Sequence, residues 1–201
     1  VMLQKQSDIR LIALVFDATG SMGHIWQEAK ANIKKLVMRQ RELTPQAKLV
    51  LVAYRDYCDG NQLLKVFPPS ADTDKLVSFL DGIDCDGGGD DPEAVEVALE
   101  RVLELKPDLA ILVGDAPPHG VADEIMKGKD YREYAQKLGE SKIPVYTVST
   151  NNHQDVVSSF QEIAKLSGGK WFQLNQVDEL IDLLSVATAK IEDHWASSSV
   201  A

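Results

Sequence analysis

The sequence has few of the residues that mark several common protein classes. Two cysteines in 201 residues are too few for a disulfide-rich scaffold. The four histidines show no H-x-x-x-H spacing and no cysteine partner, so a zinc site is not predicted. No apolar run approaches the roughly 20 residues of a membrane span, and no signal-peptide pattern occurs, so we expect no direct membrane insertion.

Motifs for nucleotide binding and for serine hydrolases are also missing. The chain has no G-x-x-x-x-G-K-[ST] loop, no strand-linked G-x-G-x-x-G and no G-x-S-x-G elbow. Positive charge is scarce, because 21 basic residues stand against 31 acidic ones and the net charge is −10. Since nucleic-acid phosphates are bound by basic surfaces, we expect no nucleic-acid partner.

The sequence does contain a regular alternation of apolar strands and amphipathic helices. This alternation predicts a single Rossmann-like, doubly wound α/β domain, with a mostly parallel six-stranded sheet, one antiparallel edge strand and helices on both faces. We expect an N-terminal extension at 1–8, the domain at 9–195 and a flexible tail at 196–201. The predicted strands cover residues 11–16, 48–54, 63–67, 109–114, 145–148 and 170–174.

Particular residues indicate where a strand ends, where one helix begins and where a C-terminal helix lies. Pro68 and Pro69 are expected to end the edge strand. Pro92 fits the first position of the helix that follows a glycine-rich acidic loop. An apolar stripe between Leu180 and Ile191 predicts a C-terminal helix.

The strand at 11–16 ends in a cluster of oxygen-bearing side chains. Asp17, Thr19 and Ser21 follow it at alternate positions, and the glycines among them allow a sharp turn into a helix. Oxygen-only ligands suit a hard divalent cation such as Mg²⁺. The simpler interpretation is a polar turn that caps the next helix.

Two further loops bring acidic residues to the same edge of the sheet. Asp115 follows a second buried strand, and the glycine-rich loop 84–93 carries several acids. Ligands in open α/β sheets collect outside the carboxyl ends of the strands, so Asp17, Asp90, Glu93 and Asp115 are expected to converge. Because gathered carboxylates repel one another and a cation relieves that repulsion, a metal site is the better interpretation.

These three pieces resemble the metal-ion-dependent adhesion site of von Willebrand factor type A domains. They are Asp17-x-Thr19-x-Ser21, the loop Gly88-Gly89-Asp90-x-Pro92-Glu93, and Asp115. The sequence is most similar to the subgroup found with alpha-type kinases, through Tyr54-Arg55-Asp56 and Gly114-Asp115-Ala116-Pro117-Pro118-His119-Gly120. The resemblance extends from about residue 9 to about residue 195.

The resemblance implies a protein-binding module for adhesion or scaffolding. Mg²⁺, or Mn²⁺ or Ca²⁺ in its place, would be held directly by Thr19 and Ser21. Asp17 and Asp115 would act directly or through water. A protein partner would then supply an acidic side chain that replaces one water on the cation.

The second loop departs from the family pattern, which more often has a threonine hydroxyl there. Counting back from the apolar helix position Leu99, this ligand falls on Glu93. Asp90 is the alternative ligand, or it holds an auxiliary cation. The identity of the second-loop ligand stays open between these two acids.

Five other residues near the predicted site are assigned possible roles. His119 could lie at the rim of the metal site, but it is expected to be a loop histidine on the surface or a contact to the partner. Arg55 and Asp56 are predicted to form an internal ion pair that supports the metal loops. Cys58 and Cys85 precede loops on the same face, so they form either a disulfide or two free thiols.

The competing interpretation of the site is an enzyme. Aspartates at two strand ends also occur in metal-dependent phosphatases and receiver domains, which need a nucleophilic aspartate and a nearby basic residue. Neither Asp17 nor Asp115 has an adjacent lysine, so we expect no enzymatic activity. A phosphohydrolase-like enzyme and a structural domain with a vestigial metal site are the alternatives. The oligomeric state and the cellular compartment stay open.

Overall fold

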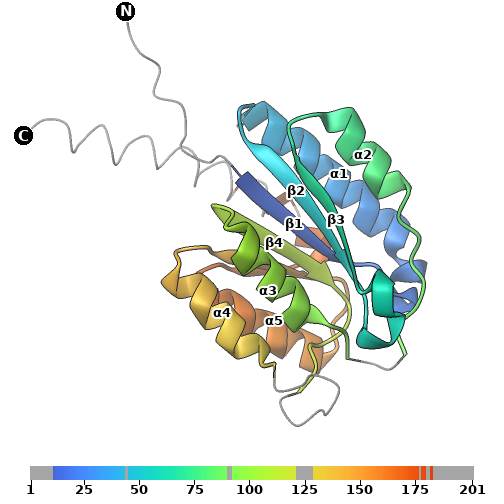
Figure 1. Ribbon diagram of the computed structural model, residues 1–201, viewed down its shortest axis with the longest axis vertical. Helices are drawn as coiled ribbons and strands as arrows, with labels where there is room; N and C mark the ends of the chain where they lie inside the picture. Colours follow the sequence, from blue (N-terminus) through green and yellow to red (C-terminus); the bar gives the residue numbers. More distant parts are fainter. Residues whose placement is uncertain are drawn as a thin grey trace, which may run out of the picture.

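One sheet organises the described part of the chain. The computed structural model describes residues 11–43, 45–89, 92–120 and 129–176, together with 178, 179 and 182. Six strands lie in the order β3-β2-β1-β4-β5-β6 (Figure 1). They are β1 (Leu11–Asp17), β2 (Lys48–Tyr54), β3 (Leu64–Ser70), β4 (Leu109–Gly114), β5 (Val145–Ser149) and β6 (Trp171–Gln173). All neighbours are parallel except β2 and β3, so the predicted fold class is confirmed.

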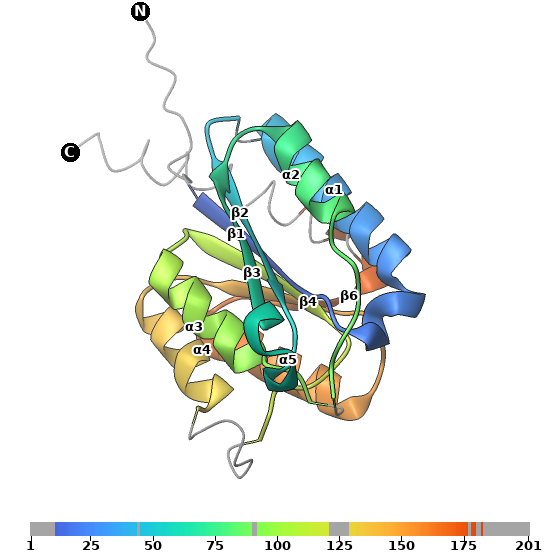
Figure 2. The ribbon, with the colours of Figure 1, turned by 45° about the vertical axis from the view of Figure 1, so that its right-hand side comes forward.

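Helices cover both faces of this sheet (Figures 1 and 2). One face carries α1 (Trp26–Leu43) and α2 (Thr73–Asp81). The other carries α3 (Val95–Leu105), α4 (Tyr131–Glu140) and α5 (Gln154–Ser167).

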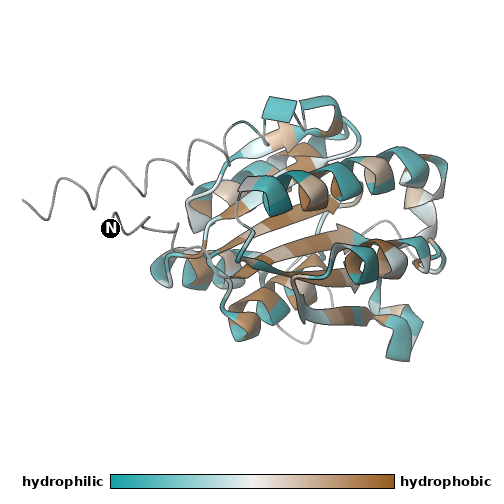
Figure 3. Cartoon of the chain, turned by 90° about the horizontal axis from the view of Figure 1, so that it is seen from above, coloured by the Kyte–Doolittle hydropathy of each residue, from teal (hydrophilic) through white to brown (hydrophobic). Residues whose placement is uncertain are grey.

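Successive residues of β1 enter two separate cores. Leu14 and Phe16 belong to the core beneath α1 and α2, whereas Ala13 and Val15 belong to the core beneath the other three helices. Because both faces are buried, the central strands are apolar at nearly every position, as their brown colour in Figure 3 shows. The absence of polar alternation in these strands follows from this two-sided burial.

The edge strand β3 is longer than the sequence predicts. Pro68 and Pro69 lie inside it, and it continues to Ser70, so the predicted end of the strand was wrong. The pairing with β2 shifts register between Leu49 and Leu51, opposite the prolines. Proline lacks the amide hydrogen that a ladder needs, and an edge strand with an irregular register accommodates that loss.

The helix after the acidic loop begins later than predicted. The first residue of α3 is Val95, not Pro92. Glu93 instead pairs with the loop after β4: its N–H donates to the Pro117 carbonyl at 2.9 Å, and it forms a β-bridge with Pro118. This pairing holds the backbone of Glu93 in an extended conformation, so the helix begins only after it.

Several predicted segments fall outside the described residues. They are the extension at 1–8, the tail at 196–201 and all of the predicted helix at 180–191 except Asp182. Within the described ranges, no helix is both long enough and apolar enough to cross a membrane.

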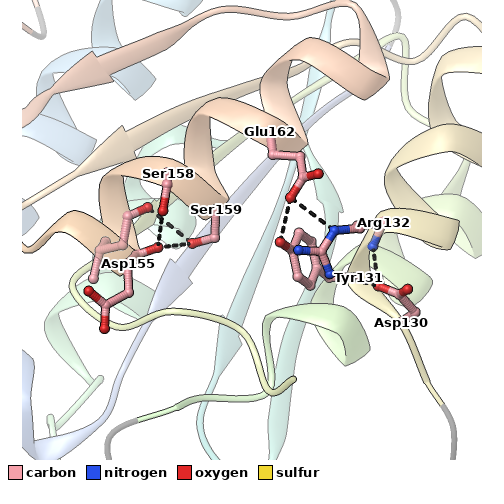
Figure 4. Close-up of polar contacts among 8 residues, drawn as sticks. Asp130, Tyr131, Arg132, Asp155, Ser158, Ser159 and Glu162 are labelled. Carbon is pink, nitrogen blue, oxygen red and sulfur yellow. Dashed lines mark hydrogen bonds and ion pairs between the residues drawn. The ribbon is translucent and has the colours of Figure 1, made fainter. Parts of the chain in front are cut away.

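Polar contacts join α4 to α5 (Figure 4), and the two helices also approach each other closely near Gly139. Glu162 of α5 accepts a hydrogen bond from the Tyr131 hydroxyl at 2.6 Å and lies 3.0 Å from Nε of Arg132. Near the end of α4, a Cβ added to Gly139 would lie 2.4 Å from the Leu166 carbonyl oxygen. Only a glycine allows the two helices to approach this closely.

We therefore expect Gly139→Ala to destabilise the fold by about 1 to 2 kcal/mol, because overpacking outweighs the better helix propensity of alanine. Gly23→Ala is the matched control, since an added Cβ meets no atom within 4 Å there. Urea denaturation of both variants measures the difference. Equal stability of the two would contradict the close approach of α4 and α5.

Candidate functional site

Three loops meet at the carboxyl edge of the sheet, where the short helices η1 (Gly20–His24) and η2 (Tyr57–Gln62) lie (Figures 1 and 2). One loop follows β1, one follows β4, and the third is the acidic loop between α2 and α3. β1 and β4 are adjacent in the sheet, so the loops after them are neighbours. The acidic loop joins them through two hydrogen bonds, from the Asp86 N–H to the Ala18 carbonyl and from the Glu93 N–H to the Pro117 carbonyl. Asp17, the last residue of β1, stands at their centre.

The Asp17 carboxylate is fully buried, and only one of its two oxygens accepts hydrogen bonds from the described residues. Its Oδ1 accepts hydrogen bonds from the Thr19 N–H at 2.8 Å and from the Thr19 hydroxyl at 2.6 Å. Its Oδ2 has no hydrogen-bond partner among the described residues. Burial and the charge of Asp115 raise the pKa of Asp17 to about 7, although the bonds from Thr19 oppose this.

Ser21 and Asp115 continue the polar cluster towards the surface. The Ser21 hydroxyl donates to Oδ1 of Asp115 at 2.9 Å and lies 3.1 Å from the Thr19 hydroxyl. Burial raises the pKa of Asp115 overall, against the lowering effect of the bond from Ser21. Hydrogen bonds thus link the side-chain oxygens of four residues in series: Asp17, Thr19, Ser21 and Asp115.

Glu93 reaches the same place from the acidic loop. A Cβ added to Gly88, whose φ is +77°, would lie 2.7 Å from Oε1 of Glu93 and 3.2 Å from Cβ of Thr19. Gly88 therefore leaves room for the Glu93 carboxylate beside Thr19. Burial, followed by the charge of Asp17, raises the pKa of Glu93 to about 9. Its Oε2 also has no hydrogen-bond partner within the described ranges.

Tyr54 is a buried member of this cluster that the sequence analysis names only within a motif and not among the site residues. It is the last residue of β2 and pairs in register with Asp17. A Cβ added to Gly114 would lie 2.5 Å from the Tyr54 hydroxyl and 3.4 Å from Cβ of Asp17. Burial and the charges of Asp17 and Glu93 raise the pKa of Tyr54. The sequence does carry a signal for it, because Tyr54 ends a buried strand beside Asp17.

His119 is buried, so its expected position on the surface is wrong, while its contact with a partner stays a prediction. Its side chain is fully buried, and Nε2 lies 2.7 Å from Oδ1 of Asp56. Tyr57 packs against the imidazole edge at 5.2 Å between ring centroids. Burial alone would raise the pKa of Asp56, but the contact with His119 lowers it overall.

The predicted internal pair of Arg55 and Asp56 is also wrong, although both residues do support the loops. Asp56 turns to His119, and Arg55 donates to the Asp84 carbonyl oxygen at 2.9 Å. Adjacent residues in extended backbone point to opposite faces, so the two side chains diverge.

Asp59 ties the loop after β2 to the acidic loop. Its Oδ2 accepts from the N–H of Asp56 at 3.1 Å and from the N–H of Gly88 at 3.0 Å. On the other side, the Gly20 N–H donates to the Gly87 carbonyl at 3.0 Å. These bonds fix the acidic loop against both neighbouring loops.

Three other candidate residues do not contribute described contacts to this cluster. Asp90 lies outside the described residues. Cys58 and Cys85 are free thiols, which resolves the two alternatives left by the sequence. Within the described ranges, no three His, Cys, Asp or Glu side chains form a metal-binding group by themselves. A cation at this edge would therefore need the hydroxyls of Thr19 and Ser21.

An open, mostly parallel α/β sheet with polar loops gathered at its carboxyl edge defines a Rossmann-like binding domain. The family model described as von Willebrand factor A domain matches residues 11–176, and the chain belongs to that family. It is also similar to an ariadne-like RING finger protein of Acanthamoeba polyphaga mimivirus, with 30% identity over 189 residues and 85% of this chain covered. The chain spans about a fifth of that protein, 19% of its length.

Solved structures share the fold at low sequence identity. A pilus adhesin, SpaC, of Lactobacillus rhamnosus GG has a TM-score of 0.66 and 11% identity, over 94% of this chain and 31% of the adhesin. Proximal thread matrix protein 1 of the mussel byssus has a TM-score of 0.66 and 16% identity, over 89% and 46%. An aerotolerance-related membrane protein of Bacteroides fragilis has a TM-score of 0.64 and 13% identity, over 90% and 99%.

The raised pKa values of Asp17 and Glu93 predict how the stability of the fold changes with pH when no divalent cation is present. Asp17 has a pKa of about 7 in the fold against an ordinary value of 3.8, so the folded chain binds the extra proton between these pH values. The free energy of unfolding should therefore fall as pH rises from about 4 to 7, and Glu93 extends the fall towards pH 9. Thermal unfolding in chelator-treated buffer measures this trend.

Asp17→Asn should flatten the decline, because the asparagine does not titrate. The exposed Asp155→Asn is the control and should keep the slope of the unaltered protein. An unaltered protein whose stability does not fall over this range, or equal slopes in the two variants, would contradict the buried-carboxylate interpretation.

Proposed function

We propose that this domain is a metal-dependent protein-binding module of the adhesion-site type. One divalent cation, Mg²⁺ or in its place Mn²⁺ or Ca²⁺, would bind at the carboxyl edge of the sheet. The residues that would hold it, directly or through water, are Asp17, Thr19, Ser21, Glu93 and Asp115.

The observation that carries this proposal is that two buried carboxylate oxygens within this cluster lack hydrogen-bond partners among the described residues. Oδ2 of Asp17 and Oε2 of Glu93 are both shielded from solvent. A buried acceptor without a donor is costly, and a bound ion relieves that cost. A cation would favour the ionised forms of Asp17, Glu93 and Asp115, whose pKa values are all raised.

The donor set also fits a hard cation. Carboxylate and hydroxyl oxygens are the ligands of Mg²⁺, Mn²⁺ and Ca²⁺, whereas softer metals favour nitrogen and sulfur. Thr19 already holds Oδ1 of Asp17, so this carboxylate is oriented before any ligand arrives.

The burial pattern gives the site one accessible side. Asp17 and Thr19 are fully buried, whereas Ser21 is exposed and Asp115 retains 8% of its exposure. When bound, the cation supplies a coordination position for a carboxylate of the partner. Ser21 and Asp115 border the approach of that carboxylate, while Asp17 keeps its place through Thr19.

Family membership supports the coarser part of the proposal, a module for protein interaction. One structural relative is named as a pilus adhesin and another as a thread matrix protein, which fits an adhesion or scaffolding role. The mimivirus relative is much longer than this chain, which fits a module within a larger protein. On its motifs, we also propose that the chain falls in the subgroup associated with alpha-type kinases.

Asp17→Ala, Ser21→Ala and Asp115→Ala should each weaken Mg²⁺ and Mn²⁺ binding about tenfold or more, because each removes an oxygen of the site. Calorimetry measures stoichiometry and affinity, with circular dichroism to confirm the fold. Asp86→Asn is the control, since this exposed acid lies in the acidic loop outside the oxygen cluster. A cation that binds Asp17→Ala as well as the unaltered protein would place the metal elsewhere.

The accessible coordination position predicts that a small carboxylate binds the Mn²⁺-loaded protein. Acetate should displace water from the cation and lower the water-proton relaxivity in a saturable manner. Acetamide, which has the same size without the charge, should not. A relaxivity that acetate leaves unchanged while Mn²⁺ stays bound would exclude carboxylate coordination as the binding mode.

A further inference from the structure

A small pocket lies beside the candidate metal site, outside the oxygen cluster. Its volume is about 160 Å³, which is room for a carboxylate and one or two waters. It opens among the end of β2, the start of β3 and the segment after α2. The residues that line it include Ala18, Ala53, Arg55, Gln62, Lys65 and Asp84.

The pocket holds two cationic side chains in a strongly acidic protein. Arg55 is half-buried, and within the described ranges neither Arg55 nor Lys65 forms an ion pair. Arg55 uses one nitrogen on the Asp84 carbonyl, and its guanidinium carries further N–H donors. Nζ of Lys65 lies 5.8 Å from the centre of the Phe79 ring. Two cations on one polar pocket provide the donors that an oxyanion requires.

We propose that this pocket is a second carboxylate-binding subsite of the partner-binding face. The charges of Arg55 and Lys65, offset by the exposed Asp84 carboxylate on the rim, leave the lining with one net positive charge. That charge matches a carboxylate better than a doubly charged phosphate. The planar guanidinium of Arg55 also matches a carboxylate in a two-point hydrogen bond.

The position of the pocket links it to the metal site. Ala18 lines the pocket and lies between Asp17 and Thr19 in the chain. Its carbonyl accepts from the Asp86 N–H at 3.2 Å, so the acidic loop passes directly over this residue. This inference rests on the proposed function. It implies that the preferred partner segment carries two acidic side chains, one that binds the cation and one that binds in the Arg55 pocket.

The test is an NMR titration of the protein with sodium acetate, in buffers freed of divalent cations on a chelating resin. Backbone amides of Ile83, Asp84 and Lys65 should shift and saturate. Sodium chloride at the same ionic strength should produce no saturable shift at these amides. Sodium phosphate is the comparison, and tighter binding of phosphate than of acetate would overturn the assignment to a carboxylate.

Two variants locate the binding in the pocket. Arg55→Gln should abolish saturation, and Lys65→Gln should weaken acetate binding about threefold. Arg55 also supports the acidic loop, so Lys65→Gln keeps the test valid if Arg55→Gln disturbs that loop. Lys48→Gln, an exposed lysine at the other end of β2, is the matched control and should bind like the unaltered protein. Equal acetate affinity in Lys65→Gln and Lys48→Gln would overturn the subsite.

The outcome is independent of the metal. Saturable acetate binding that Lys65→Gln weakens supports the subsite even if Mg²⁺ fails to bind and the proposed function is wrong. Tight Mg²⁺ binding without saturable acetate binding at these amides overturns the subsite and leaves the metal site intact.

Discussion

The burial of the Asp17 carboxylate at the end of the central strand is the constraint on which the rest of this edge depends. A carboxylate withdrawn from water loses its hydration and needs local donors to remain in place. Thr19 supplies two of them to a single oxygen, which fixes the turn after β1. That turn directs Ser21 towards Asp115, and so brings the loop after β4 into the same cluster.

Hydrogen bonds from side chains and backbone join the surrounding loops to one another. Asp59 joins the loop after β2 to the acidic loop, and Asp56 joins it to His119. His119 itself stands four residues after Asp115, at the end of the loop that follows β4. The acidic side chains at this edge are therefore placed by partners that belong to different loops, and the fold brings those loops together.

Much of this arrangement could be predicted from the sequence, because it follows from local patterns. The apolar runs of β1 and β4 identify buried parallel strands, and the residues directly after them must lie at one edge. The positions of Asp17, Ser21 and Asp115 follow from that rule alone. The glycine-rich composition of the acidic loop indicates a turn at Gly88, although its role in leaving room for Glu93 needs coordinates.

The remainder depends on contacts between distant residues, which no local pattern reveals. Nothing near His119 indicates burial, because its partner Asp56 lies 63 positions away. Pro92 has the propensity to start a helix, but the bridge between Glu93 and Pro118 outweighs it. In both cases a hydrogen bond between residues distant in the sequence determines the structure, although the local sequence favours a different one.

The irregular edge strand has a consequence for how this domain meets other molecules. A free strand edge offers a row of backbone donors and acceptors to which another chain can add. In β3, Pro68 and Pro69 carry no amide hydrogen, so this part of the strand offers fewer donors, and the charged Lys65 lies exposed on the same strand. The outer edge of β3 is therefore a poor template for a seventh strand. Copies of this domain can crowd together at high local density without joining their sheets into a continuous fibre through that edge.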